Sequence, residues 1–118
     1  MSTKIIHQEI RSFGYAIKGF VVSVRRDRHF RFHVLAAIAV VITGAVCKVS
    51  KMEWIILTLC IALVFAAELL NSAIESLTDM VSPEWNVHAG RVKDISAAAV
   101  LVCSIASAVV ALLIFIVE

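Results

Sequence analysis

Four polar side chains recur at helical spacing in the second half of the sequence, separated by three, four and four residues. They are Glu68, Asn71, Glu75 and Asp79. At about 100° per residue, this spacing places them in one narrow stripe along a helix. Glu68 follows the apolar run 54–67, in which Thr58 is the one polar residue. Carboxylates within an apolar span are costly and persist where they are paired, hydrated or used, so the stripe is a candidate functional site.

The alternative is that the stripe is the solvated face of an amphipathic helix end. This interpretation fits Asp79 best. Glu68 lies more than about two turns deeper in the apolar segment, and a short carboxylate reaches the interface less readily than the long stems of Lys and Arg. Glu68 is therefore the most informative single residue.

These residue types suit phosphoryl transfer. Mg²⁺ prefers oxygen ligands and is usually held by one or two carboxylates together with substrate phosphates. Glu75 and Asp27 could supply these carboxylates, and Asp79 is a further candidate. Phosphoryl transfer also needs a base that accepts the proton of the attacking hydroxyl, and Glu68 suits this role. Lys93 and Arg91 could bind phosphate oxygens. No glycine-rich nucleotide-binding motif is present, so the residues alone do not identify the phosphoryl donor.

Composition indicates one small membrane domain covering residues 1–118. The chain is 61% hydrophobic and 17% charged, with a mean hydropathy of +0.96, far from the composition of a soluble domain. The formal net charge of +2 is too small to indicate a nucleic-acid partner. The three cysteines show no metal-ligand spacing and are interpreted as packing residues, and no cleavable signal peptide is expected.

The pattern predicts an all-α membrane protein. A basic amphipathic helix over about 4–26 is expected to lie on the membrane surface. Transmembrane helices are expected over about 30–49, 54–80 and 95–117. A short turn at 48–53 and a polar loop after the Ser82-Pro83 break would connect them. Small residues on one face of the last span, namely Ala97, Ser104, Ala108 and Ala111, predict helix association and an oligomer.

Charge asymmetry predicts the orientation. Seven of the eleven Lys and Arg residues lie in residues 1–31, and short basic flanks stay on the cytoplasmic side. Asp27, Glu75, Asp79, Lys93 and Asp94 would then gather at the cytoplasmic interface, with Glu68 somewhat deeper. That layout suits chemistry between a water-soluble donor and a membrane acceptor.

One long segment resembles a known signature. AELLNSAIESLTDMVSPEWNVHAGRVKDISAAAVL is similar to the signature of the prokaryotic integral-membrane diacylglycerol kinase family, which includes the undecaprenol kinases. The resemblance extends to GYAIKG at 14–19 and HFRFH at 29–33. It implies a homotrimer in the bacterial cytoplasmic membrane that transfers the γ-phosphate of ATP, with Mg²⁺, to a lipid alcohol.

The resemblance also implies roles for individual residues. Glu68 would be the catalytic base, and Glu75 with Asp27 would bind magnesium. The expected nucleotide contacts are Tyr15, Glu84, Lys93 and Asp94. The expected supporting or substrate-contacting residues are Asn71, Asp79 and Arg31. Two positions depart from the family pattern: Asp27 stands where glutamate is usual, and Gln8 stands where an arginine can contact nucleotide, a role that Arg11 could take.

The HFRFH segment and the Glu53-Trp54 pair favour undecaprenol as the acceptor, with diacylglycerol as the alternative. Two non-enzymatic interpretations also fit parts of the sequence. An oligomeric channel or proton relay would use Glu68 and Asn71 as a path, although such a path should carry polar residues in the outer half of the span too. A structural or chaperone-like subunit would use only the small-residue face of the last span.

Overall fold

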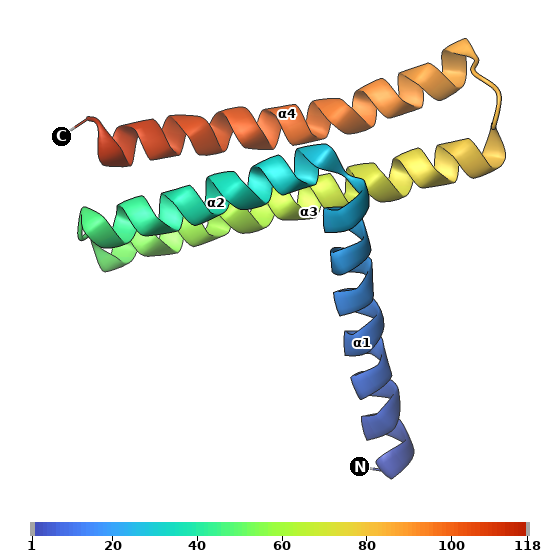
Figure 1. Cartoon of the computed structure of the whole chain (residues 1–118), viewed down its shortest axis with the longest axis horizontal. Coiled ribbons are helices and arrows are strands. Elements are labelled where there is room, and N and C mark those ends of the chain that lie inside the picture. Colours follow the sequence, from blue (N-terminus) through green and yellow to red (C-terminus); the bar gives the residue numbers. More distant parts are fainter. Residues whose placement is uncertain (1, 118) are drawn as a thin grey trace.

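The computed structural model describes residues 2–117 as four helices in succession. They are α1 (Thr3–Arg26), α2 (Arg28–Val46), α3 (Lys51–Val81) and α4 (Val87–Phe115). The last three run side by side, and α1 leaves this layer and projects away from it (Figure 1). Each of α2, α3 and α4 is long and apolar enough to cross a membrane. The expected all-helical fold with three spans is confirmed at this level, whereas the surface position of α1 and the trimer remain predictions.

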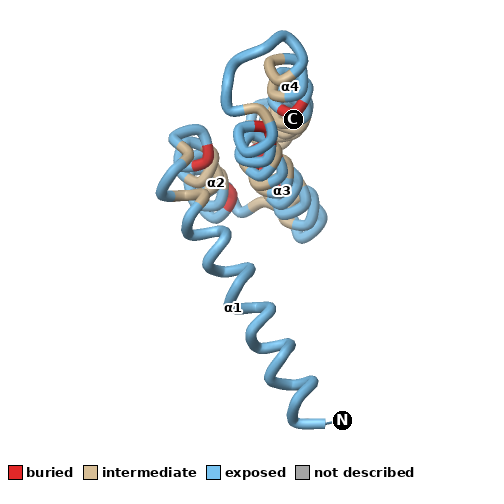
Figure 2. Tube along the Cα trace, turned by 90° about the vertical axis from the view of Figure 1, so that its right-hand side faces the viewer, coloured by how far each residue is buried: buried red, intermediate tan, exposed pale blue. Residues whose placement is uncertain are grey.

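Helix α3 is the centre of the layer. It packs along most of α4 on one side and against α2 on the other. Little is buried inside the single chain, as the mostly exposed tube in Figure 2 shows. Among residues 2–117 the buried hydrophobic side chains are Phe30, Leu57 and Val64. Most large apolar side chains are exposed, which fits a protein whose outer surface is covered by lipid or by other subunits.

The helices differ in length, and this difference exposes the polar end of α3. At 1.5 Å per residue the 31 residues of α3 span about 46 Å, against about 28 Å for the 19 residues of α2. A hydrocarbon core is about 30 Å thick. Asp27, just before α2, contacts Ser72 partway along α3. The last turns of α3 and the first turns of α4 therefore extend beyond the start of α2 (Figure 1).

The corner between α1 and α2 is held by specific contacts. The Arg31 guanidinium donates to the carbonyl oxygens of Val24 and Arg25 at 3.1 and 2.7 Å, which satisfies acceptors that the end of α1 would leave unpaired. One phenylalanine from each of three helices packs beneath this corner. They are Phe20, Phe30 and Phe65, with ring centroids 5.2–6.1 Å apart. These contacts fix where α1 joins the layer.

Two helix starts differ from the sequence prediction. The expected turn at 48–53 is shorter, because Ser50 and Glu53 form a capping box that begins α3 at Lys51, a signature visible as Ser-x-x-Glu. The polar loop expected after Pro83 ends at Asn86, whose side chain accepts from the backbone N–H of Ala89 at 2.9 Å and caps α4. Residues 88–94 are therefore helical, because the Asn86 cap begins α4 before the apolar run starts.

The other end of the layer is closely packed. A Cβ added to Gly44 would lie 2.7 Å from the indole carbon Cη2 of Trp54. The backbone of α2 thus approaches the indole more closely than any side chain would allow. A small residue at this position lets α2 and α3 come together, as in other membrane helix pairs.

Candidate functional site

The predicted polar stripe lies on one continuous helix, and burial divides it in two. Glu68 and Asn71 are buried, with 2% and 8% of their surfaces exposed. Glu75 and Asp79 are exposed, on the part of α3 that extends beyond the start of α2. The stripe therefore connects the interior of the helix layer with its open end.

Asp27 lies at the junction of α1 and α2, and its side chain is held beside this stripe. Its Oδ2 accepts a hydrogen bond from the Ser72 hydroxyl at 3.0 Å, and its Oδ1 accepts one from the backbone N–H of His29 at 2.9 Å. Burial by itself would raise the pKa of Asp27. Hydrogen bonds with Glu68, Ser72 and the backbone N–H groups of His29 and Phe30 together lower the pKa by more than burial raises it, so it lies below the ordinary value. Asp27 is therefore a carboxylate at neutral pH, in contact with the Glu68 carboxyl group.

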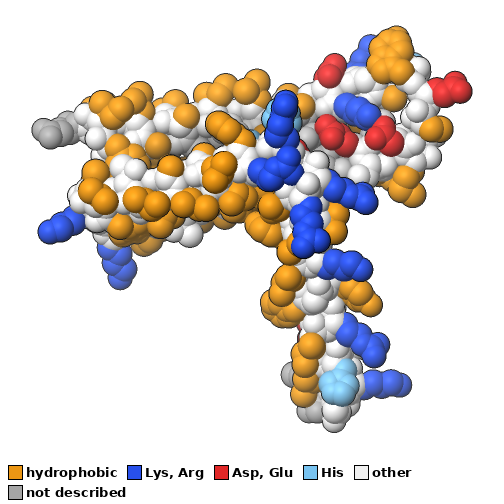
Figure 3. Space-filling model, viewed as in Figure 1, with side chains coloured by type: hydrophobic (Ala, Val, Ile, Leu, Met, Phe, Trp, Pro, Cys, Tyr) orange, Lys and Arg blue, Asp and Glu red, His pale blue; other side chains and the backbone are white. Residues whose placement is uncertain are grey.

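A cleft of about 710 Å³ with a partly charged lining, called here the polar cleft, opens between the end of α1 and the C-terminal half of α3. Its walls carry both signs of charge. The charged lining residues are Arg26, Asp27, Arg28, Glu75 and Asp79. Figure 3 shows acidic and basic side chains together on the part of the molecule where α3 and α4 extend beyond α1. The cleft brings together three of the predicted acids: Asp27, Glu75 and Asp79.

An apolar groove of about 360 Å³ lies between α2, α3 and α4, along the N-terminal half of α3. Its lining is almost wholly apolar, and it includes three residues of the predicted small-residue face of the last span, Ser104, Ala108 and Ala111. His33 lines the groove as well. The groove therefore lies along the membrane-spanning helices, with a histidine in its wall.

Glu68 lines neither the apolar groove nor the polar cleft, but it contacts one lining residue of each. Its Oε2 is 3.8 Å from Nε2 of His33, which lines the groove. Its carboxyl group also contacts that of Asp27, which lines the cleft. A buried carboxyl group thus contacts one residue from an apolar compartment and one from a charged compartment.

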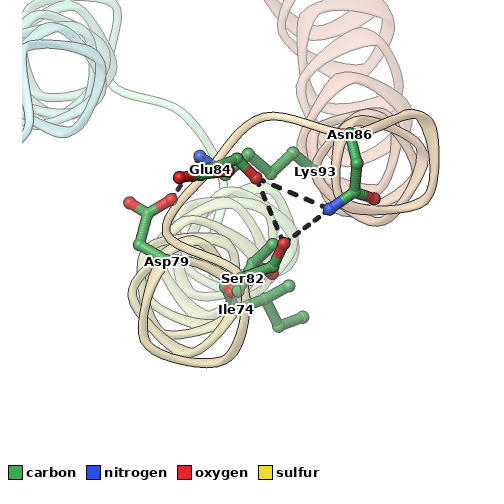
Figure 4. A network of polar contacts seen from close by, with 7 residues as sticks. Ile74, Asp79, Ser82, Glu84, Asn86 and Lys93 are labelled. Atoms are coloured by element: carbon green, nitrogen blue, oxygen red, sulfur yellow. Dashed lines mark hydrogen bonds and ion pairs between the residues drawn. The ribbon is translucent and has the colours of Figure 1, made fainter.

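A polar network orders the α3–α4 connection near the cleft (Figure 4). Lys93 Nζ lies 2.6 Å from Oδ1 of Asp79, an ion pair between the two helices. The backbone carbonyl of Glu84 accepts from the hydroxyl of Ser82 at 3.2 Å, and the Asn86 amide donates to the same carbonyl and to that hydroxyl. Lys93 is thus held with its ammonium group next to Asp79, an acid of the cleft, and its phosphate contact remains a prediction.

Other predicted site residues lie apart from the cleft within one chain. Tyr15, Glu84 and Asp94 are exposed and do not line it. Among residues 2–117 no group of three or more His, Cys, Asp or Glu side chains is arranged to hold a metal ion. Arg31 donates to carbonyls of α1, and Oδ1 of Asn71 is buried without a hydrogen-bond partner among the described residues. Their functional roles remain predictions.

Two residues of this region were missed by the sequence interpretation. Ser72 holds Asp27, and His33 lies beside Glu68. A weak signal existed for each. Ser72 is one helical turn after Glu68, and His33 stands directly before the apolar run 34–47, where a polar ring at the edge of a span can turn toward other helices.

Comparisons with known proteins identify relatives that match most of this chain. The sequence model of the prokaryotic diacylglycerol kinase family matches residues 14–115. The chain is 38% identical over 110 residues to an undecaprenol kinase of Bacillus subtilis, covering 93% of this chain and 89% of that protein. It is 31% identical over 100 residues to a diacylglycerol kinase of Escherichia coli, covering 85% and 82%. It is 32% identical over 90 residues to a diacylglycerol kinase of Pseudomonas aeruginosa, covering 76% and 73%. The chain therefore belongs to the prokaryotic diacylglycerol kinase family.

Proposed function

We propose that this protein is a lipid kinase that transfers the γ-phosphoryl group of Mg-ATP to the hydroxyl group of a membrane lipid alcohol. Undecaprenol is the favoured acceptor, giving undecaprenyl phosphate, and diacylglycerol is the alternative. The preference is supported by the higher identity to a protein named undecaprenol kinase than to those named diacylglycerol kinase. Both acceptors present a primary hydroxyl attached to a long apolar body.

One observation carries the proposal: the Glu68 carboxyl group contacts both His33, which lines the apolar groove, and Asp27, which lines the charged cleft. The groove, formed by spanning helices, suits the hydrocarbon chain next to the lipid hydroxyl. The cleft, with its arginines and carboxylates, suits the phosphates of a nucleotide. The two substrates of a lipid kinase differ in this same way, and the reacting atoms must meet where the compartments adjoin.

The reaction moves one proton, forms one oxygen–phosphorus bond and breaks another. In its deprotonated form, the Glu68 carboxylate accepts the proton of the lipid hydroxyl as that oxygen bonds to the γ-phosphorus of ATP. The bond from the γ-phosphorus to the bridging oxygen of ADP breaks, and ADP leaves with that electron pair. The products are the lipid phosphate, ADP and one proton, which Glu68 later releases. The catalytic contribution is positioning together with neutralisation of charge.

The residues of the cleft fit a magnesium ion. Asp27 and Glu75 both line it and offer hard oxygen ligands, and Asp27 is ionised at neutral pH. Two protein carboxylates match the usual mode of Mg²⁺ binding, in which substrate phosphates and water complete the coordination. When bound there, Mg²⁺ would neutralise charge on the phosphates. Lys93, paired with Asp79, would contact phosphate oxygens at the end of the cleft that Asp79 lines.

We further propose that the active unit is a homo-oligomer, a trimer by family resemblance, in the bacterial cytoplasmic membrane with the cleft facing the cytoplasm. The small buried core supports association, and the exposed positions of Tyr15, Glu84 and Asp94 fit contacts to nucleotide bound at a neighbouring subunit. The basic N-terminal region supports the orientation.

The test is a phosphorylation assay on purified full-length protein in phospholipid vesicles, with γ-labelled ATP and Mg²⁺. Undecaprenol, diacylglycerol and ceramide are compared as acceptors. We expect labelled lipid with undecaprenol at a higher turnover than with diacylglycerol, and loss of product when EDTA removes divalent cations. The absence of labelled lipid with every acceptor would overturn the proposal, and a preference for diacylglycerol would replace the favoured substrate.

A further inference from the structure

His33 connects the groove with the buried carboxylate. It lines the apolar groove, yet its ring nitrogen Nε2 faces Oε2 of Glu68 at 3.8 Å. The side chain is 16% exposed, so it is largely enclosed by the helices. A polar ring in an apolar wall is costly unless it is hydrogen-bonded.

The separation of the two side chains is informative. At 3.8 Å, Nε2 and Oε2 are too far apart for a good direct hydrogen bond. A single oxygen atom can nevertheless lie within hydrogen-bond distance of both. With typical lengths of about 2.9 Å to nitrogen and about 2.75 Å to oxygen, the two bonds meet at that oxygen at about 85°. A hydroxyl group there can accept from the ring N–H and donate to the carboxylate.

The groove determines which hydroxyl this would be. Its lining beyond His33 consists mainly of apolar side chains of α2, α3 and α4, including Phe32, Val40 and Val64. A long-chain alcohol can place its apolar chain along this lining with its hydroxyl at the His33 end. A free nucleotide would instead meet the charged cleft on the other side of Glu68.

Building on the proposed function, we propose that His33 orients the lipid substrate, its Nε2–H donating to the hydroxyl oxygen that gives its proton to Glu68. This contact fixes the hydroxyl relative to the base and turns one oxygen lone pair toward the cleft, where the γ-phosphate is bound. A directed donor at this position matters because rate depends steeply on alignment of the reacting atoms. The role is distinct from the proton acceptor, which is Glu68.

A matched pair of variants tests the inference. His33→Gln retains an N–H donor at similar reach, and His33→Met has a similar length without a donor. His29→Met is the control, because His29 is an exposed histidine one turn earlier on the same helix. Phosphorylation of undecaprenol by Mg-ATP is measured in vesicles over full ranges of both substrates. Circular dichroism and gel filtration establish that each variant folds and assembles.

We expect His33→Met to lower kcat for undecaprenol roughly 10-fold, the order expected for one lost hydrogen bond in the reacting complex. His33→Gln should stay within about 3-fold of the unmodified protein, and the KM for Mg-ATP should be unchanged in both. A purely structural role would instead lower both variants together or alter nucleotide KM. If His33→Met fails to assemble, His33→Leu takes its place in the same comparison.

The outcomes separate the two proposals. An unmodified protein that phosphorylates no lipid alcohol overturns the proposed function and the inference with it. An active protein in which His33→Met equals His33→Gln in kcat overturns the role of His33 alone. A loss of activity in His29→Met as large as that in His33→Met overturns it too, because the effect would then not depend on contact with Glu68.

Discussion

Replacing Glu68 by glutamine tests the base assignment directly. Glutamine has nearly the same size, and its amide can donate a hydrogen bond to the Asp27 carboxylate that Glu68 contacts. Because the side chain at 68 is 2% exposed, this retained bond should keep the packing of α1, α2 and α3 around it. The amide cannot accept the proton of the lipid hydroxyl. The substitution therefore removes basicity and leaves shape.

The magnitude follows from the role and the surroundings. Loss of a general base costs about 10²- to 10⁴-fold in rate. The adjacent Asp27 carboxylate can accept a proton poorly in its place, so we expect the lower part of this range, roughly 10²-fold. That loss corresponds to about 2.7 kcal/mol of transition-state stabilisation. Affinity for Mg-ATP should be retained, because the cleft residues are unchanged.

Glu75→Gln is the contrasting variant. Glu75 is exposed and lines the cleft, so its loss should weaken Mg-ATP binding while much of the turnover returns at saturating nucleotide. Transfer of labelled phosphate to lipid gives the turnover, and equilibrium binding of labelled nucleotide gives the affinity. Near-normal turnover of a folded, assembled Glu68→Gln protein would show that Glu68 is not the base. Equal loss of nucleotide affinity in both variants would show that Glu68 belongs to the nucleotide site.

Three further predictions follow from particular contacts. Gly44→Ala should lower the thermal stability of the detergent-solubilised protein, by roughly 1–3 kcal/mol, because the new Cβ would lie 2.7 Å from Trp54; an unchanged melting temperature would contradict this packing. Asp27 has a lowered pKa, so its stabilising contribution is present above the ordinary value of 3.8 and is lost as pH falls through the lowered pKa; Asp27→Asn should reduce the pH dependence of thermal unfolding below about pH 4. Lys93→Met should leave stability nearly unchanged, since its ion pair with Asp79 is screened by solvent, yet should raise the KM for Mg-ATP; a large stability loss with unchanged KM would make the pair structural.

The number and type of helices were predictable from the sequence because apolar runs in a membrane protein are long and the backbone must form helices there. The helix starts were less predictable. Apolar periodicity marks the part of a helix inside the membrane, whereas the start is set by capping side chains such as Ser50 and Asn86. The sequence contained the capping box at Ser50 and Glu53, but the hydrophobic pattern alone does not include it.

The candidate site was predictable in part, for a different reason. The stripe from Glu68 to Asp79 lies on one helix, so spacing alone could place its members on one face. Contacts between helices have no such periodicity. The contacts of Asp27 with Ser72 and of His33 with Glu68 depend on the position of α2 along the axis of α3. This position is set by the Phe20, Phe30 and Phe65 cluster together with the close approach at Gly44.

The position of Asp27 gives α1 a part in the site beyond anchoring. Asp27 ends α1 and caps α2, and the same carboxylate contacts Glu68 and Ser72 of α3. Arg31 ties the end of α1 to this corner, so the helix cannot tilt without moving Asp27. If α1 lies on the membrane surface, as the sequence predicts, it would set the depth of a cleft ligand relative to the buried base. This geometry would couple the level of the membrane surface to the meeting of a water-soluble donor with a lipid hydroxyl.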